Sequence, residues 1–194
     1  MNPLKSITGT IILGFVVAVV ISFLIDAPGN EGWSLIVWLH VFFGIIWIGL
    51  LYYFNFVQVP AAAEAAADSG GPGPAAISKY VAPRALLWFR WSALLTWITG
   101  AAALEAAGWG IQNSFLLQPG VQVIGIGAWL GTIMLFNVWV LIWPNQKKIL
   151  GIVEASEQEI AKAKTVALMA SRTNTFLSIP MIMCMVGQMH GLPL

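Results

Sequence analysis

Two histidines, His40 and His190, are the side chains of this sequence best suited to chemistry. Each lies in a long apolar segment, where an ionisable residue is costly and by default marks a functional site. At a helical rise of about 1.5 Å per residue, His40 lies ~28 Å from Val59 and His190 lies ~22 Å from Thr175. We therefore expect the two imidazoles at similar depth on separate helices. Because neutral imidazole is a good iron ligand, the pair predicts axial ligation of one non-covalent haem b.

Small residues accompany this predicted haem site. Gly44 follows the first histidine by about one turn, and Gly187 precedes the second by nearly one turn. Gly127 and Gly131 lie in another apolar segment, and Trp47 shares a helical face with the first histidine. A flat macrocycle between helices requires close approach of their backbones, which glycine permits. Ordinary helix packing in membranes also favours glycine, so both interpretations remain open.

Other residues offer rival roles near the histidines. Each histidine taken alone is also compatible with an interfacial or hydrogen-bonded position. Methionines close to the second histidine could supply an axial sulfur instead, although at this spacing methionines usually fill a core. These methionines are Met181, Met183, Met185 and Met189.

Glu105 and Arg90 are the candidate catalytic residues. Glu105 is expected at the depth of the histidines, where it could relay protons or bind a histidine or a substrate. An acid at a helix end that reaches toward water explains it equally well. Arg90 lies inside an apolar segment and requires a partner. It belongs to a polar group that forms either a hydrogen-bond network or a pocket for a quinone or an anionic substrate. The members are Asn55, Gln58, Arg90, Asn137, Arg172, Asn174 and Thr175.

The composition places these residues in a membrane protein. The 194 residues are 59% hydrophobic and 9% charged, with a mean hydropathy of +0.83, which is too apolar for a soluble domain. The net charge of +1 gives no reason to expect a nucleic-acid partner. The single cysteine, Cys184, excludes a disulfide framework and a cysteine metal cluster. No C-x-x-C-H occurs, so a covalently attached c-type haem is excluded.

We predict an all-α integral membrane protein, a bundle of five transmembrane helices forming one domain over residues 1–194. The expected spans are residues 7–25, 34–59, 85–107, 121–143 and 175–190. Residues 60–83, rich in Ala, Gly and Pro, are expected to form a flexible loop. Residues 148–171, polar and rich in alanine, are expected to form a surface helix. Pro144 is expected to end the fourth span, and Pro180 to kink the fifth.

The basic residues predict the orientation of the bundle. With the N-terminus in the cytoplasm, all nine Lys and Arg residues fall on the cytoplasmic side, and the outer loops and outer helix ends carry only acids. The positive-inside rule therefore favours a cytoplasmic N-terminus and a periplasmic C-terminus in a bacterial inner membrane.

Four segments, in order, resemble the membrane domain of the bacterial urate hydroxylase that carries a fused cytochrome c, the PuuD type. They are WLHVFFGIIWIGLLYYF (38–54), PRALLWFRWSALLTWITG (83–100), GTIMLFNVWVLIWPNQK (131–147) and SRTNTFLSIPMIMCMVGQMH (171–190). The resemblance implies a membrane redox protein whose His40 and His190 match family histidines. The longer family members have further histidines around the loop after the second span, where this chain has none.

The leading hypothesis is a cytochrome b-like protein with one bis-His haem b near the periplasmic face. Its partners would be the lipid bilayer and a cytochrome c or a larger respiratory or photosynthetic complex. One alternative is a urate hydroxylase-like oxidoreductase that uses Glu105 or Arg90 for its substrate. The other alternative is a cofactor-free structural subunit of a membrane complex.

Overall fold

The apolar segments form long helices, because a helix satisfies its own backbone hydrogen bonds where water is absent. The computed structural model describes residues 2–25 and 31–193. The longer helices are α1 (Ile7–Leu24), α2 (Glu31–Tyr53), α4 (Ala82–Ala106), α6 (Gln122–Phe136) and α8 (Glu157–His190). The shorter ones are α3 (Val59–Ala67), α5 (Ile111–Phe115), α7 (Trp143–Ile149) and the 3₁₀ turn η1 (Pro3–Lys5). Within the described ranges there is no strand, so the predicted all-α class is confirmed.

Three helical stretches of the described chain are long and apolar enough to cross a membrane. They are Ile7–Leu24, Gly32–Ala67 and Gln122–Ile149. The other two long helices mix apolar and polar residues. The first half of α8 carries Glu157, Glu159, Lys162 and Lys164, and α4 carries Arg84, Arg90 and Glu105. The structure is therefore compatible with a membrane protein.

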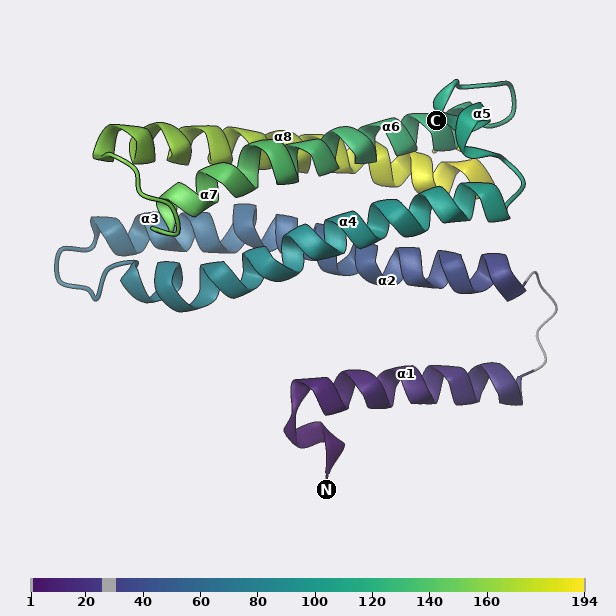
Figure 1. Cartoon of the computed structure of the whole chain (residues 1–194), viewed down its shortest axis with the longest axis horizontal. Helices are drawn as coiled ribbons and strands as arrows, with labels where there is room; N and C mark the ends of the chain where they lie inside the picture. The colour runs from purple at the N-terminus through teal and green to yellow at the C-terminus, as the bar shows by residue number, and fades with distance from the viewer. Residues whose placement is uncertain (1, 26–30, 194) are drawn as a thin grey trace.

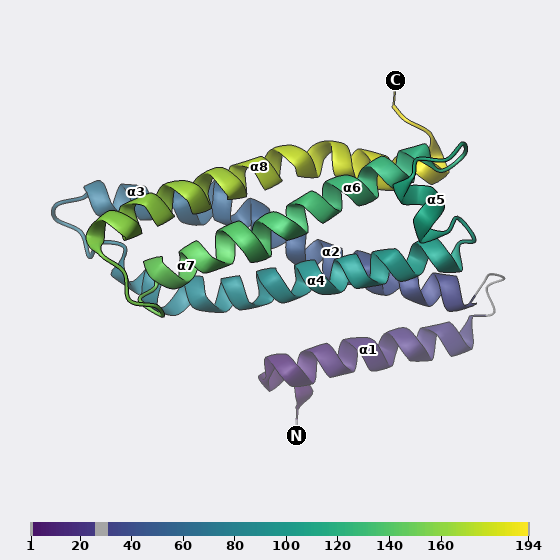
Figure 2. The ribbon, with the colours of Figure 1, turned by 45° about the horizontal axis from the view of Figure 1, so that its top comes forward.

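Four helices form the bundle, with α2 packed on α4 and α6 packed on α8 (Figures 1 and 2). The end of the bundle that carries α5 also holds the start of α2 and the last turn of α8. The opposite end carries α3, α7 and the start of α8, and we call it the basic end because Lys79, Arg84, Lys147, Lys148, Lys162 and Lys164 lie on the segments there. Helix α1 lies beside the bundle, and none of its described residues is buried.

The core lies between the four bundle helices and is mainly apolar. Leu51, Phe89 and Met134, from three different helices, are each at most 1% exposed. Trp47, Ala93 and Val138 belong to the same cluster and are at most 2% exposed. Because these side chains leave little accessible surface, a polar group among them that finds no partner inside the bundle costs free energy.

Three prolines inside helical stretches are each preceded by a wider, π-helical turn. The π-helical segments are η2 (Phe54–Gln58), η3 (Ile77–Val81) and η4 (Asn137–Ile142). Each ends two residues before a proline: Pro60, Pro83 and Pro144, respectively. A proline removes one backbone N–H and crowds the carbonyl of the preceding turn, and a locally wider turn makes room for its ring. Pro144 was expected to end its helix, but the helical path continues through it into α7.

Two expected boundaries differ in the structure. Residues 148–171 were expected as a separate surface helix, but α8 is continuous from Glu157 to His190 and includes Pro180. The reason is packing, since its buried alanines Ala163, Ala167 and Ala170 recur at helical spacing and α8 contacts α7. Of the expected loop 60–83, much is helical, because α3 extends to Ala67 and η3 begins at Ile77.

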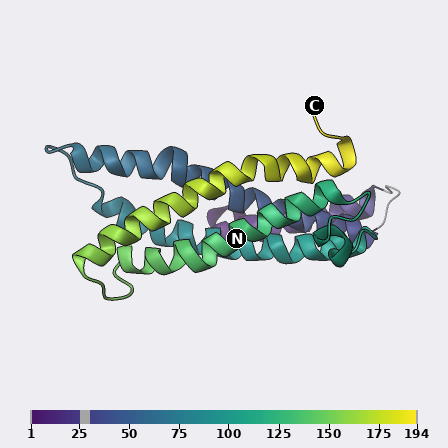
Figure 3. The ribbon, with the colours of Figure 1, turned by 90° about the horizontal axis from the view of Figure 1, so that it is seen from above.

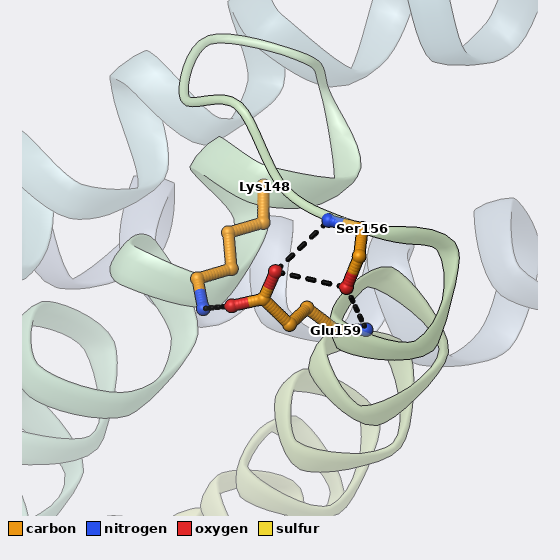
Figure 4. A network of polar contacts seen from close by, with 3 residues as sticks. All are labelled: Lys148, Ser156 and Glu159. Carbon is orange, nitrogen blue, oxygen red and sulfur yellow. Dashed lines mark hydrogen bonds and ion pairs between the residues drawn. The ribbon is translucent and has the colours of Figure 1, made fainter.

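Helix α8 begins with a capping box (Figure 4). The Ser156 hydroxyl accepts a hydrogen bond from the Glu159 amide at 3.3 Å, and the Glu159 carboxylate accepts one from the Ser156 amide at 2.9 Å. Lys148 at the end of α7 forms an ion pair with Glu159 at 3.5 Å. The reciprocal bonds satisfy two amides that a helix start otherwise leaves unpaired. This cap explains where α8 starts, and Figure 3 shows its start beside α7.

Gly125 and Gly131 of α6 provide a matched test of the packing. A Cβ on Gly125 would collide with the backbone carbonyl oxygen of Ser114, whereas a Cβ on Gly131 would meet no atom within 4 Å. We expect Gly125→Ala to destabilise the protein by about 1–3 kcal/mol, the usual cost of overpacking. Gly131→Ala is expected to be neutral or slightly stabilising, because alanine is the better helix former. Unfolding midpoints in detergent would measure both, and equal midpoints for the two variants would contradict this packing.

The cap of α8 should weaken in acid. Backbone and side-chain hydrogen bonds from Ser156, and then the charge of Lys148, lower the pKa of Glu159 from its ordinary value of 4.5. A lowered pKa stabilises the folded state above the ordinary value, and this contribution is lost as the pH falls through the folded-state pKa. We expect Glu159→Gln to increase hydrogen exchange at the start of α8 at neutral pH. At a pH low enough to protonate this carboxyl in the folded protein, wild type and variant should exchange alike. A difference that persists unchanged at that pH would rule out this role of the carboxylate.

Candidate functional site

His40 is fixed against α4 by one strong hydrogen bond. Its Nδ1 lies 2.8 Å from the backbone carbonyl oxygen of Thr96. Directly beside the ring is Gly100, where an added Cβ would lie 2.9 Å from Cε1 and 3.0 Å from Nδ1 of His40. The imidazole therefore occupies the space that a side chain at position 100 would fill. Its position is set by α4, which supplies both the acceptor and the gap.

The hydrogen bond determines which ring nitrogen of His40 carries the proton. A carbonyl oxygen can only accept, so Nδ1 is the donor and carries hydrogen. In the neutral imidazole, Nε2 then keeps its lone pair, and it has no hydrogen-bond partner among the described residues. This arrangement is the one that metal-binding histidines use, with one nitrogen donating to a carbonyl and the other free to bind. His40 is thus prepared to bind a metal or to accept a proton.

His190 lies elsewhere relative to α2. It is the last residue of α8 and is exposed. Two observations place α8 relative to α2. The hydroxyl groups of Tyr52 and Ser178 are hydrogen-bonded at 2.9 Å, and Met189 and Trp33 line the same cavity. His40 falls between these two points along α2, whereas His190 lies just beyond the second. The structure therefore places both histidines toward the α5 end of the bundle, with His40 about two turns further in than Trp33.

The end of α8 is held in place by polar contacts with α6. The Gln188 side chain accepts a hydrogen bond from the Ile124 amide at 3.1 Å and donates one to the Gly120 carbonyl at 2.9 Å. The cavity beside this end has a volume of about 300 Å³ and is lined by Trp33, Ala106, Ala107, Trp109 and Met189. It is larger than the hollow lined by Ile11, Gly14, Phe15, Trp38 and Phe42, and it lies where α2, α4 and α8 meet.

The glycines predicted to line a haem site act first in helix packing. A Cβ on Gly127 would lie 3.1 Å from Cβ of Cys184, so this glycine lets α6 approach α8. A Cβ on Gly187 would meet Leu192 and Val123, and one on Gly44 would only touch Thr96 at 3.7 Å. Gly131 is buried but faces free space. Three of the four therefore contribute to contacts between protein segments.

Glu105 caps α5, the short helix that follows α4. Its carboxylate accepts a hydrogen bond from the Ile111 amide at 2.7 Å, and the residue is exposed. The neighbouring turn is closed by backbone bonds from Gly108 to Glu105 and from Gly110 to Leu104. This position explains Glu105 as a residue that orders the connection between α4 and α6. No described contact joins it to His40 or His190.

Arg90 stacks on an aromatic ring near the basic end. Its guanidinium carbon lies 3.8 Å from the centre of the Trp143 ring, at the start of α7. Next to it, Trp91 packs edge-on against Trp139 at 5.4 Å. Among the described residues, Arg90 has no carboxylate partner, and Lys148–Glu159 is the ion pair that the structure shows. The stacking contact provides the partner that an arginine in an apolar helix requires.

Several of the remaining polar residues of the predicted group join α8 to the π-helical segments η2 and η4. Asn174 is fully buried; its side chain donates to the Met134 carbonyl at 2.9 Å and accepts from Asn137 at 2.8 Å. Asn55 donates to the Ser171 hydroxyl at 2.8 Å. Most of these polar atoms are satisfied within the protein, as expected for a hydrogen-bond network that fixes helix positions. The Gln58 carbonyl oxygen is the exception, buried without a partner in the described chain.

Trp47, predicted near the cofactor, lies in the core. It is 2% exposed, and its indole Nε1 is buried with no partner in the described chain. An unpaired indole N–H costs free energy, so the burial of Trp47 in the core is not fully compensated by hydrogen bonding. Trp47 is two turns from His40 on the same face of α2.

Thr96 and Gly100 are the functional residues that sequence reasoning did not single out. Every residue has a backbone carbonyl, so nothing in the sequence marks the one at Thr96 as the acceptor for His40. A glycine inside an apolar helix was the available signal, since glycine there often marks the close approach of another group.

Gly100→Ala tests the seating of His40. The added methyl would overlap the imidazole, so we expect the ring to move, its bond to Thr96 to weaken and the protein to lose about 1–3 kcal/mol of stability. Gly49→Ala on α2 is the matched control, because a Cβ there would meet nothing within 4 Å. Thermal unfolding in detergent would compare the variants. If Gly100→Ala unfolds no earlier than Gly49→Ala, His40 is not seated on Gly100.

Comparison with known proteins supports the resemblance seen in the sequence. Residues 106–193 match the family model described as Urate oxidase N-terminal. No curated protein and no solved structure matches this chain. The matched region includes α5, α6, α7 and α8 with His190, whereas His40 on α2 lies outside it. Over residues 106–193 this chain is therefore similar to the urate oxidase N-terminal family.

Proposed function

We propose that this protein is a membrane redox protein of the urate hydroxylase type that binds one haem b through His40. The observation that carries the proposal is the imidazole itself, which donates from Nδ1 to Thr96 and leaves Nε2 free. The match to the urate oxidase N-terminal family supports the redox class. A bound haem would supply one-electron oxidation and reduction at its iron.

The residues around His40 fit a haem ligand on that side. The Thr96 carbonyl fixes the tautomer and orients the ring, as partners behind metal-binding histidines do. Gly100 leaves the room that the ring occupies. The Trp47 ring, two turns away on the same face of α2, adds an apolar surface of the core below the ligand. The apolar core below would exclude water and so influence the reduction potential.

A second residue would hold the haem iron from the side opposite α4. His190 was predicted for this role, and it is exposed at the end of α8. Met185 lies within the stretch of α8 that runs alongside α2, between Ser178 and Met189, and it is partly buried against the core. We keep His190 as the proposed ligand and use Met185 as the competing residue in the test.

The proposal includes a five-span arrangement, in which α4 and α8 cross the membrane together with the three more apolar stretches. Burial of their polar groups against neighbouring helices supports this, because polar groups in spans face the protein interior. The concentration of Lys and Arg at the basic end supports a cytoplasmic position for that end in a bacterial inner membrane. Electrons would then leave at the α5 end, to a cytochrome c or a larger respiratory or photosynthetic complex.

Urate oxidation is a second candidate, favoured by the family match alone. The carboxylate of Glu105, which was considered for substrate chemistry, accepts a hydrogen bond from the amide of Ile111. Turnover of urate with an added electron acceptor would support this candidate. A cofactor-free structural subunit would instead keep its assembly and function in His40→Ala and His190→Ala variants.

Reduced-minus-oxidised optical spectra of the detergent-purified protein test the haem proposal. We expect sharp b-type bands that are lost in His40→Ala, because the iron loses its seated ligand. Bands lost in His190→Ala but kept in Met185→Leu identify His190 as the second ligand, and the reverse identifies Met185. Thermal unfolding of each variant would show whether it is folded. A folded wild-type protein that shows no haem bands after supplementation with haem would overturn the proposal.

A further inference from the structure

We propose that Arg90 and Trp143 form a binding site for the phosphate of a membrane lipid, where the guanidinium on α4 meets the ring at the start of α7. This site is separate from the proposed haem site and does not depend on it. The starting point is the guanidinium of Arg90, stacked on the Trp143 ring at 3.8 Å. In the described chain it forms neither a hydrogen bond nor an ion pair with another residue.

Stacking leaves the binding edge of this arginine free. A guanidinium is planar and carries its five N–H donors around the rim, so an aromatic ring against one face blocks none of them. The ring also holds the plane in one orientation, which reduces the entropy lost on binding. Arg90 is half-buried, so its donors are partly removed from water and need an acceptor. The structure thus presents an oriented cation without its anion.

The surroundings indicate an anion that comes from the lipid side. On the adjacent outer face of α4, Leu87, Trp88 and Trp91 are 45%, 54% and 49% exposed, respectively. Tryptophans gather at the level of lipid headgroups, and four are found here: Trp88, Trp91, Trp139 and Trp143. Trp91 packs edge-on against Trp139 at 5.4 Å, so the aromatic side chains of α4 and η4 are in contact next to Arg90. A lipid lying along α4 would bring its phosphate to this level.

The local charge also favours an anion. Lys147 and Lys148 lie one turn beyond Trp143, and Arg84 lies nearer the start of α4. The carboxylate of Glu159 is taken up by Lys148 and by the α8 cap. A phosphodiester offers two oxygens at the spacing of the guanidinium fork, which makes bidentate binding possible. An arginine is therefore expected to bind it better than a lysine at the same position.

Native mass spectrometry of the delipidated protein in detergent, with added phosphatidylglycerol or phosphatidylcholine, tests this site. We expect Arg90→Gln to weaken phosphatidylglycerol binding by about tenfold, the equivalent of one charge-assisted contact. Arg90→Lys should lose several-fold, because lysine keeps the charge but lacks the fork and the stacking. Trp143→Leu should lose a similar amount. Arg84→Gln, the matched control on the exposed start of α4, should bind like wild type.

Four results would overturn the proposal. Equal lipid binding by Arg90→Gln and wild type would show that Arg90 does not hold the phosphate. An equal loss in Arg84→Gln would reduce the effect to overall charge. Displacement of the lipid by inorganic phosphate would assign the site to a free anion, and displacement by urate would assign it to a substrate. Unfolding midpoints within a few degrees of wild type would confirm that each variant is folded. If Arg90→Gln does not fold, the binding of phosphatidylglycerol by Arg90→Lys still tests the proposal.

Discussion

Satisfying polar groups inside an apolar bundle is the constraint on which this structure depends. Leu51, Phe89 and Met134 are almost fully buried, so a polar side chain beside them loses free energy unless it finds a partner in the protein. Asn174 does so with both ends of its amide, and thereby ties α8 to α6 and η4. The same requirement applies to the backbone, and the π-helical turns before Pro60, Pro83 and Pro144 are its local solution.

The contacts of His40 and Arg90 show two outcomes of this constraint. His40 satisfies one nitrogen with the Thr96 carbonyl and keeps the other available, and its position depends on the absence of a side chain at Gly100. Arg90 satisfies the face of its guanidinium with Trp143 and keeps the rim available. In both cases one contact orients a group whose remaining capacity can bind something else. The two proposals, haem and lipid phosphate, concern opposite halves of the bundle and can fail separately.

Composition and periodicity predicted the features that depend on short stretches of chain, such as the position of a single helix. The first span was expected at 7–25, and α1 covers Ile7–Leu24. Long-range packing decided the others. The alanine face of α8, buried along α7, turned an expected surface helix and a separate span into one continuous helix. From the sequence, Glu105 was equally compatible with a chemical role and with a position at a helix end. In the structure it caps α5, because the turn at Gly108 brings the Ile111 amide next to its carboxylate.

The sequence by itself determined that this chain is helical and strongly apolar, and it singled out His40, because charged and polar residues are rare in such segments. Only the tertiary structure decided which backbone carbonyl orients His40, where His190 lies relative to it, and that Arg90 faces Trp143. The physical reason is that a carbonyl is present at every position and a helix can rotate or tilt against its neighbour. Contacts between helices therefore carry no local signal, and they exist only once the helices have packed.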